Sequence, residues 1–343
     1  MTKKRLYLDV HVIQTLPPSN VNRDDTGSPK TAQYGGVRRA RVSSQAWKKA
    51  IRNYFCEKGV DLGIRTKDIL NGVLERVISL DPMWDRDEAL GCIRKAYELV
   101  NVQIKEDKKS GKELTQALFF LGKRQAEEFA KEIVENKEKY LEETKKTEKK
   151  SKTRSNKKKS DEKLVEILNS QPEIDIALFG RMVADEPQLN TDASCQVAHA
   201  LSTHAIQMEF DYFTAMDDLS PEDQSGAGML GNVEYNSSTL YRYANIAVHD
   251  FVVQWGDKTA VISACKLFVE AFSNSLPTGK ENAFAHQTLP SLVMVTLRED
   301  RPVNLVSAFE NPIKTDHENG YVDASVDRLE KEYVKTEKFV QEP

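Results

Sequence analysis

Residues 60–143 read as one long helical stretch, placed between two regions whose apolar residues alternate as in β-strands. The segment LTQALFFLGKRQAEEFAKEIVENKEKYLEE shows the helical pattern, with charged residues interleaved at spacings of three and four. Residues 5–16, RLYLDVHVIQTL, alternate with a period of two, which predicts a half-buried strand. Strand patterns return at 173–184, 192–207, 238–253 and 291–298. Strands that flank an inserted helical lobe indicate an α+β protein.

Turn-forming and capping residues mark the other elements. Pro17 and Pro18 are expected to end the first strand, and a long loop rich in turn formers follows as far as Gly36. Ser43 or Ser44 is the expected N-cap of a helix over about 45–58. Residues 209–238 resemble a long hairpin that stands off a sheet. Further helices are expected near 161–169, near 258–275 and from about 324.

The length and composition allow a large folded core. With 343 residues and 39% apolar content, the chain forms one large domain with insertions or two domains. No apolar run approaches the roughly 20 residues that span a bilayer, and the first residues show a strand pattern in place of a signal peptide. The expected location is therefore the cytoplasm. The cysteines form no CxxC pair, which argues against a zinc site, and most are expected in the core: Cys56, Cys92, Cys195 and Cys265.

Positive charge is concentrated at the start of the chain. The formal net charge is -4, but residues 1–55 hold eleven Lys and Arg against three Asp. Most of these cations surround the stretch YGGVRRARVSSQAWKKAIRN at 34–53: Arg23, Arg38, Arg39, Arg41, Lys48, Lys49 and Arg52. Glycines let a backbone approach a phosphate, a helix N-terminus favours anions, and Ser43 and Gln45 add short donors. The pattern favours a phosphate cradle, and a solvated basic face is the alternative.

Two further segments bear on nucleic-acid binding. Residues 144–160 hold nine Lys and Arg against one Glu, without an aromatic residue, so we expect a mobile loop that either attracts polyanions or is only solvated. At the start of the 209–238 segment, Tyr212, Phe213 and Met216 suit stacking on bases or wedging between them. Taken alone, these three side chains fit core packing better.

Enzymatic motifs are weak or missing. His199 and His204 have a spacing that fits no HExxH site, and we expect them to be hydrogen-bonded interior histidines. The pairs Asp24-Asp25 and Asp217-Asp218 could hold a divalent metal for phosphodiester cleavage, but adjacent acids in polar loops are usually turn or cap residues. The sequence has no Walker loop, GxSxG elbow or GxGxxG motif.

Several motifs together resemble one family. VNRDDTGSP, GGVRRARVSSQAWKKAIR, DIALFGRM, VAHALSTH, DYFTAMDDL and YRYANI occur in the order and approximate spacing of the CasC-type backbone subunit of the type I-E CRISPR surveillance complex, Cascade. The resemblance covers most of the chain outside the helical lobe and the C-terminal tail. The basic segment at 144–160 is not expected from the family.

The resemblance implies a modified RRM-like (ferredoxin-like) palm, an inserted helical fingers lobe and a long thumb hairpin. The palm would be discontinuous, over 1–58 and 170–343. The fingers would span 59–169 and include a basic disordered loop at 144–160, and the thumb would be the hairpin at 209–238.

The resemblance also assigns roles to particular residues. It implies contacts to the guide-RNA backbone for Arg23, Ser43, Gln45, Lys48, Lys49 and Arg52, and packing against bases for Met182. Arg38 and Arg41 join the RNA-binding set through the basic stretch. Tyr212, Phe213, Thr214 and Met216 would form a thumb tip that displaces one base at regular intervals. Tyr and Met stand there in place of an expected tryptophan and valine.

The expected function is that of a non-catalytic RNA-binding scaffold. Its implied partners are crRNA, the target DNA strand through the guide, copies of itself in a helical filament and other Cascade subunits, with no cofactor and no membrane. One alternative is a metal-dependent RNase of the same RRM-like superfamily, which would use Asp24, Asp25, Asp217 or Asp218. Another is a free-standing regulator that binds single-stranded RNA.

Overall fold

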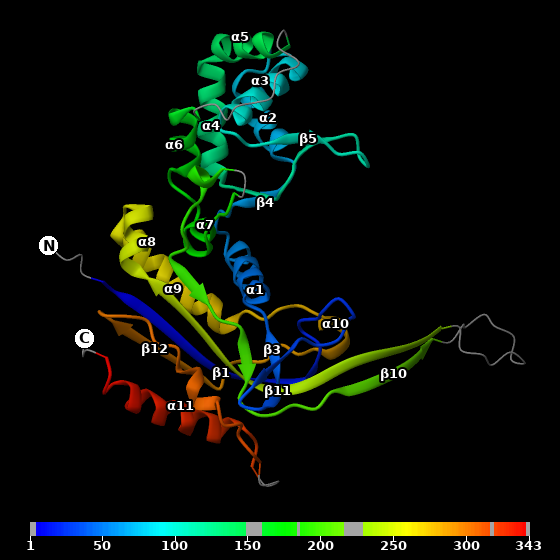
Figure 1. Cartoon of the computed structure of the whole chain (residues 1–343), viewed down its shortest axis with the longest axis vertical. Coiled ribbons are helices and arrows are strands. Elements are labelled where there is room, and N and C mark those ends of the chain that lie inside the picture. Colours follow the sequence, from blue (N-terminus) through cyan, green and yellow to red (C-terminus); the bar gives the residue numbers. More distant parts are fainter. Residues whose placement is uncertain (1–4, 149–159, 184–185, 216–228, 316–318, 341–343) are drawn as a thin grey trace, which may run out of the picture. The chain divides into compact units, whose positions relative to one another are not determined.

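The chain divides into two compact units, coloured along the sequence in Figure 1. The computed structural model describes residues 5–148, 160–183, 186–215, 229–315 and 319–340. The sheet unit comprises residues 1–55, 195–249 and 262–343, and the helical unit comprises 56–194 and 250–261. The expected domain boundary between residues 169 and 170 falls inside the helical unit, which continues to Ser194.

An antiparallel sheet organises the sheet unit. Its strands are β1 (Tyr7–Ser19), β2 (Thr31–Tyr34), β3 (Val37–Val42), β8 (Cys195–Val197), β9 (Ala200–Ser202), β10 (Glu209–Ala215), β11 (Met229–Ala247) and β12 (Leu292–Arg298). They lie in the order β12-β1-β11-β9-β3-β2, and β8 and β10 also pair with β11. The central strand β1 thus has β11 and β12 as antiparallel neighbours. An antiparallel sheet in a chain that also contains helices confirms the predicted α+β fold class.

Both faces of the sheet are covered by helices. On one face, Arg242 of β11 lies between Trp47 of α1 (Ser44–Glu57) and Phe272 of α9 (Lys258–Asn274). On the other face, β1 and β11 pack against η2 (Leu305–Phe309) and α11 (Val322–Thr336). The core on that second face contains Ile13, Tyr241, Tyr243, Leu305, Phe309, Ile313 and Leu329. Residues 241 and 242 contribute to opposite faces because side chains alternate along a strand.

The first strand continues through its two prolines. The expectation that Pro17 would end it is wrong, since β1 extends to Ser19. The pairing with β11 shifts register between Leu16 and Ser19, where the prolines offer no N–H to the ladder. The loop that follows also contains regular structure, the β2–β3 hairpin, because Gly35 and Gly36 supply the positive φ of its turn.

The helical unit has its own core. Its helices are α2 (Ile69–Leu80), α3 (Arg86–Leu99), α4 (Lys123–Glu135), α5 (Lys137–Glu148), α6 (Glu162–Asn169), α7 (Ile174–Phe179), the 3-10 helix η1 (Pro187–Leu189) and α8 (Val248–Trp255). Val73, Ile93, Tyr97, Phe129 and Leu164 are fully buried where these helices meet. The rings of Tyr97 and Phe129 stack with centroids 4.7 Å apart.

The sequence pattern predicted helix throughout residues 60–143, and this prediction is wrong in part. Two small ladders interrupt them, formed by β4 (Ile64–Thr66) with β7 (Phe119–Leu121) and by β5 (Ile104–Glu106) with β6 (Glu113–Thr115). Helix α4 begins only after Gly122. The preceding residues Phe119–Leu121 pair as a strand, because aromatic side chains favour strands.

Two expected strand segments contain helices. In 173–184, Ile174–Phe179 form α7, which ends at Gly180 with φ +78°. In 238–253, β11 ends at Ala247 and α8 follows. Short apolar runs do not distinguish a buried strand from a buried helix. The helices expected near 161–169, near 258–275 and from 324 are present as α6, α9 and α11.

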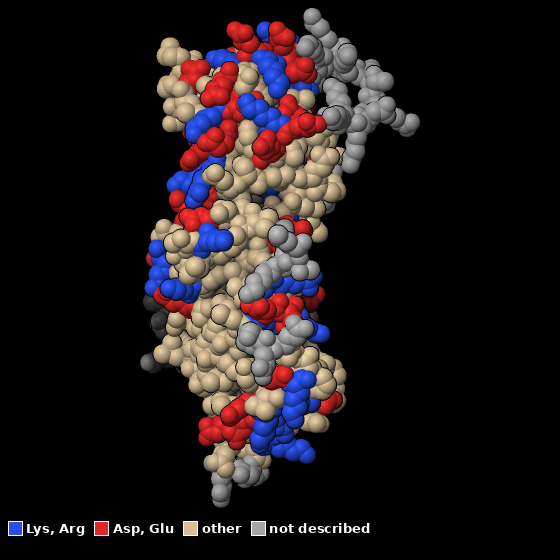
Figure 2. Space-filling view, turned by 90° about the vertical axis from the view of Figure 1, so that its left-hand side faces the viewer, with Lys and Arg blue, Asp and Glu red and all other residues tan. Residues whose placement is uncertain are grey.

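Charges of both signs share the surface of the helical unit. On the face seen in Figure 2, Lys and Arg side chains lie among Asp and Glu side chains over its helices. Lys123–Asp61, Lys137–Asp81 and Lys139–Asp161 are examples of ion pairs. Of the basic segment at 144–160, residues 144–148 belong to α5 and residues 149–159 lie outside the described chain.

The cysteines are free, Cys56 being exposed and Cys92, Cys195 and Cys265 buried. Within the described chain, no helix is both long and apolar enough to cross a bilayer.

Candidate nucleic-acid interface

The loop between β1 and β2 is shaped by its own polar side chains. Oδ1 of Asp24 accepts hydrogen bonds from the Thr26 amide (3.0 Å), the Thr26 hydroxyl (2.7 Å) and the Ser28 amide (3.0 Å). The hydrogen bond from the Thr26 side chain is the main cause that lowers the pKa of Asp24. This carboxylate therefore organises a turn, as adjacent acids in polar loops commonly do.

The same loop is tied to the start of α1. The Ser43 amide donates to Oδ1 of Asn22 at 2.8 Å. Oγ of Ser43 accepts from the Ala46 amide at 3.4 Å, so Ser43 caps the helix and is itself buried. Gln45 is exposed just beyond the cap. Ser43 thus shapes the helix start, and Gln45 is the predicted RNA-contacting residue that the cap presents to solvent.

Helix α1 separates apolar and basic side chains. Trp47, Ala50, Ile51 and Phe55 are buried against the sheet. Lys49 is exposed, and Lys48 and Arg52 are half-buried one turn apart. The predicted phosphate-contacting cations of this helix therefore lie off its buried face.

The three arginines of β3 have different roles. Arg38 is exposed, whereas Arg39 is fully buried and donates to the carbonyl oxygens of Tyr34, Ser202 and Phe309. Including Arg39 among the phosphate-facing cations was wrong, because its donors are used inside the sheet unit. Burial also lowers the pKa of Arg39.

Arg41 belongs to a small basic cluster with Lys30 and His199. Its guanidinium donates to the Thr31 carbonyl at 3.0 Å and contacts Nδ1 of His199 at 3.1 Å. Partial burial, and then the charges of Arg41 and Lys30, lower the pKa of His199. His199 is exposed, so the expectation of an interior residue is wrong for it. For His204 that expectation is confirmed, since this buried ring binds the Ala205 carbonyl and the Thr239 amide.

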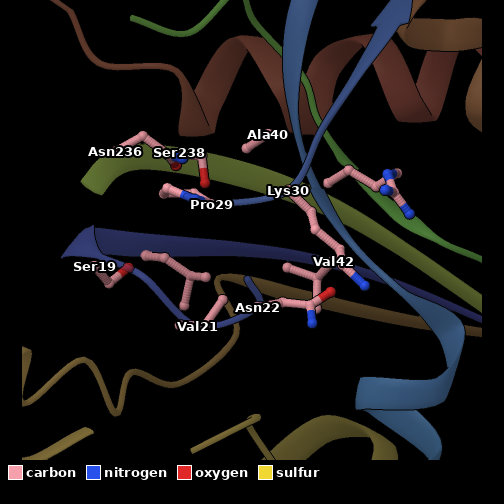
Figure 3. Close-up of a pocket in the computed structure, with 11 residues that line it drawn as sticks. Ser19, Val21, Asn22, Pro29, Lys30, Ala40, Val42, Asn236 and Ser238 are labelled. Atoms are coloured by element: carbon pink, nitrogen blue, oxygen red, sulfur yellow. The ribbon is translucent and has the colours of Figure 1, made fainter. Parts of the chain in front are cut away.

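Lys30 is a further cation of this surface that the sequence did not single out. It lines a small pocket together with Arg41, and Figure 3 shows it with Asn22 at one end, away from Asn236 and Ser238 of β11. Its position in the sequence, in a loop rich in turn formers beside the basic stretch, could have indicated that Lys30 lies near these cations. The pocket brings the cations of the loop and of β3 to one surface.

The two glycines of the basic stretch shape the protein itself. Gly35 has φ +58°, and a Cβ there would lie 1.6 Å from the carbonyl oxygen of Glu310. Gly36 has φ +77° and open space around it. The close approach that Gly35 permits is therefore to the protein backbone, not to a phosphate as the sequence suggested.

The expected thumb is a β-hairpin formed by β10 and the first part of β11, which leaves the sheet in Figure 1. Tyr212 is 66% exposed, and Thr214 is also exposed. Phe213 is 40% exposed and sits opposite Gly231, where a Cβ would lie 2.2 Å from its ring. Tyr212 is thus free to contact a ligand, while Phe213 packs within the hairpin. Met216 lies outside the described residues, as do Asp217 and Asp218.

Met182 is in the helical unit and is 77% exposed. Its neighbour Arg181 is buried and binds the carbonyl oxygens of Leu168 and Leu189, which fixes the backbone beside it. An exposed methionine on a fixed backbone suits an apolar contact with a planar ring. Among the residues that the structure describes, no group of three or more His, Cys, Asp or Glu could hold a metal ion.

Comparisons with known proteins agree over almost the whole chain. The family model described as CT1975-like protein matches residues 8–343. One similar solved structure is a chain of a "CRISPR RNA-guided surveillance complex, pre-nicking", with 33% identity, a TM-score of 0.83, and coverage of 97% of this chain and 89% of that chain. Another, from a "CRISPR RNA-guided surveillance complex", has 29% identity, a TM-score of 0.72, and coverage of 97% and 88%. No curated protein sequence matches.

Proposed function

Because the chain belongs to the CT1975-like protein family, we propose that it is a backbone subunit of an RNA-guided CRISPR surveillance complex of the Cascade type. The observation that carries this proposal is the similarity to surveillance-complex chains over 97% of the sequence. The subunit is of type I-E, acts in antiviral defence in the cytoplasm, and assembles with other Cascade subunits. Copies of it form a helical filament along the crRNA.

The basic surface of the sheet unit suits the grip on RNA. Lys49 and Arg38 are exposed, and Arg41 joins Lys30 beside His199. Cations on a fixed scaffold bind phosphates without reading sequence, and they release counterions when they do so. Specificity then comes from pairing between the guide and the target DNA, while the protein supplies shape and charge.

The hairpin suits the display of bases in segments. Tyr212 offers an exposed ring, and each base has a face on which such a ring can stack. A side chain that wedges into the strand displaces one base and leaves the intervening bases open to pairing. Met182 offers a second apolar contact.

The subunit is proposed to be non-catalytic and to need no cofactor. Asp24 is one of the acids that the RNase alternative would use. Its Oδ1 accepts three hydrogen bonds within its own loop. No observation supports the RNase alternative.

The test is the RNA that co-purifies with the full chain. A filament protects a span of fixed length from nuclease, with a regular interval between protected segments. A free-standing RNA-binding regulator would protect a smear of lengths, and that result would overturn the proposal.

A further inference from the structure

Met182 is exposed although an apolar surface lies beside it. It lines a small pocket of the helical unit together with Val102, Leu118, Phe119 and Val183. A flexible methionine side chain would remove apolar area from water by folding onto such a surface. Its exposure of 77% therefore indicates a backbone that directs this side chain outward.

The backbone on both sides of Met182 is held by hydrogen bonds. The Arg181 amide donates to the carbonyl oxygen of Thr191, and the Thr191 amide donates to that of Arg181, both at 2.9 Å. The Val183 amide donates to Oδ1 of Asn190 at 2.6 Å. The segment is thus paired like a strand, in which adjacent side chains point to opposite sides. With Arg181 directed inward, Met182 is directed outward.

The Arg181 side chain occupies the interior of the helical unit and has one acceptor for each of its five N–H donors. These acceptors, at 2.7–3.3 Å, are the carbonyl oxygens of Phe120, Leu168 and Leu189 and the side-chain oxygens of Gln125 and Asn169. They belong to β7, α4, α6 and η1. One guanidinium therefore ties the segment that carries Met182 to four elements.

Stability alone is a weak reason for this buried cation. Arg181 is 3% exposed, its five acceptors are neutral groups, and burial lowers its pKa to about 10, so it still carries its charge at neutral pH. Taking a charge out of water is costly, and apolar side chains of similar volume often serve a core equally well. A planar fork of five donors offers something that they lack, which is a fixed direction for each hydrogen bond.

We propose that Arg181 is a positioning residue for the display of RNA bases: its guanidinium holds the backbone at Met182 so that the thioether stays directed at the bound bases. The inference rests on the proposed function, in which Met182 packs against bases, and adds to it the residue that sets this contact. Arg181 acts only through Met182, because its own donors are used inside the helical unit.

A double-mutant cycle separates this role from a purely structural one. Arg181→Lys keeps the charge but offers three donors in place of five. In the full chain it is expected to weaken binding of a single-stranded RNA by up to about tenfold, which is the contribution of one methionine–ring contact. The log-log salt slope should stay the same, since no phosphate contact is lost. In the Met182→Ala background, Arg181→Lys should have no further effect on RNA binding.

Two further variants complete the test. Asn190→Ala removes only the acceptor of the Val183 amide, from an exposed side chain, so it should keep the fold even if Arg181→Lys does not. Its loss of RNA binding should depend on Met182 in the same way. Phe129→Leu is the matched control, because it loosens the core of the same unit at the ring that stacks on Tyr97. It should lower the temperature of thermal unfolding and leave RNA binding unchanged.

Three results would refute the inference while the proposed function stands. The first is an equal loss of RNA binding with and without Met182→Ala, or a similar loss in Phe129→Leu, since loosening of the unit would then be the cause. The second is unchanged binding in both Arg181→Lys and Asn190→Ala. The third is unchanged binding in Met182→Ala, which would leave no contact to position. If the unaltered chain protects RNA of no fixed length, the proposed function itself fails.

Discussion

The guanidinium carbon of Arg242 lies 3.8 Å from the centre of the Trp47 ring. Arg242 belongs to the central strand β11, and Trp47 lies on the buried face of α1, next to the cations Lys48 and Lys49. The same guanidinium donates to Gln14 of β1 and to the Phe272 carbonyl of α9. Burial lowers the pKa of Arg242 to about 9. This cation–π contact is therefore one of the contacts that pack the helix with the basic side chains against the middle of the sheet.

Replacing Trp47 with Ala should test that contact. Trp47 is 1% exposed, so its loss leaves a cavity and removes a partner of Arg242. The expected cost is about 3–5 kcal/mol of unfolding free energy, measured by urea denaturation. Val293→Ala, on a 40% exposed side chain of β12, is the control and should cost much less. Equal losses would show that the contact does not anchor the helix.

The paired glycines of the β2–β3 turn offer a matched comparison. The new Cβ of Gly36→Ala meets no neighbour. The variant should lose about 1–2 kcal/mol of unfolding free energy, from its positive φ alone. Gly35→Ala has a similar backbone strain, and its Cβ would also push the Glu310 carbonyl away. Its loss of unfolding free energy should therefore be clearly larger. Thermal unfolding of both variants measures the difference. Equal shifts would mean that the approach to Glu310 contributes nothing.

Lys49 should contribute one phosphate contact to RNA binding. Because it is exposed on the side of α1 away from the sheet, Lys49→Ala should leave stability unchanged and weaken binding to all RNA sequences alike. The log-log salt slope should fall by about 0.7. Fluorescence titration at several salt concentrations gives this slope, with Lys331→Ala as control. A loss confined to certain sequences would contradict a phosphate contact.

Tyr212 should set the spacing of displaced bases. Its ring is 66% exposed on the hairpin, and base stacking on an aromatic ring contributes about 1–3 kcal/mol per base. Tyr212→Ala should erase the regular interval of reactive bases in chemical mapping of the bound RNA, without changing the salt slope. Tyr212→Phe keeps the ring and should keep the interval. If the alanine variant retains the interval, the spacing comes from another part of the subunit.

His11 should make the fold sensitive to acid. It is fully buried, its Nδ1 lies 2.9 Å from the Tyr241 hydroxyl, and burial followed by the nearby Arg298 charge lowers its pKa to about 3. The unfolded chain binds a proton near pH 6.5 while the native chain does not, so stability is full above that pH and falls as the pH drops toward 3. His11 contributes at most about 1.4 kcal/mol per pH unit to the slope of the unfolding free energy against pH.

Urea denaturation at pH 7, 6, 5 and 4 measures this slope. His11→Gln should flatten the dependence, whatever its effect on stability at pH 7. Burial raises the pKa of the neighbouring Asp9, which gives a contribution of opposite sign, but Asp9 is present in both proteins and does not affect their difference. Parallel curves for the two proteins would exclude His11 as the source.

Local patterns in the sequence were enough for many elements and for part of the interface. The alternation in residues 5–16 predicted the start of β1, and the spacing of Trp47, Ile51 and Phe55 predicted α1 with its cations on the other side. Both patterns depend only on neighbouring residues, since a strand repeats every two residues and a helix every 3.6. The hairpin over 209–238 was expected from its aromatic start, its Gly, Ser and Pro residues and the alternation that resumes from Ser238, and β10 does pair with β11 there.

Contacts between distant parts of the chain decided the rest. Arg38 and Arg39 are adjacent and chemically identical. Arg39 is nevertheless buried, because its guanidinium donates hydrogen bonds to the carbonyl oxygens of Ser202 and Phe309. Gly35 is required by the close approach of the Glu310 carbonyl oxygen, and Gly279 by that of the Val21 carbonyl oxygen. The sequence by itself determined the periodic elements and the surplus of cations near the N-terminus. Only the tertiary structure decided which cations face solvent, because a buried partner hundreds of residues away leaves no trace in the local pattern.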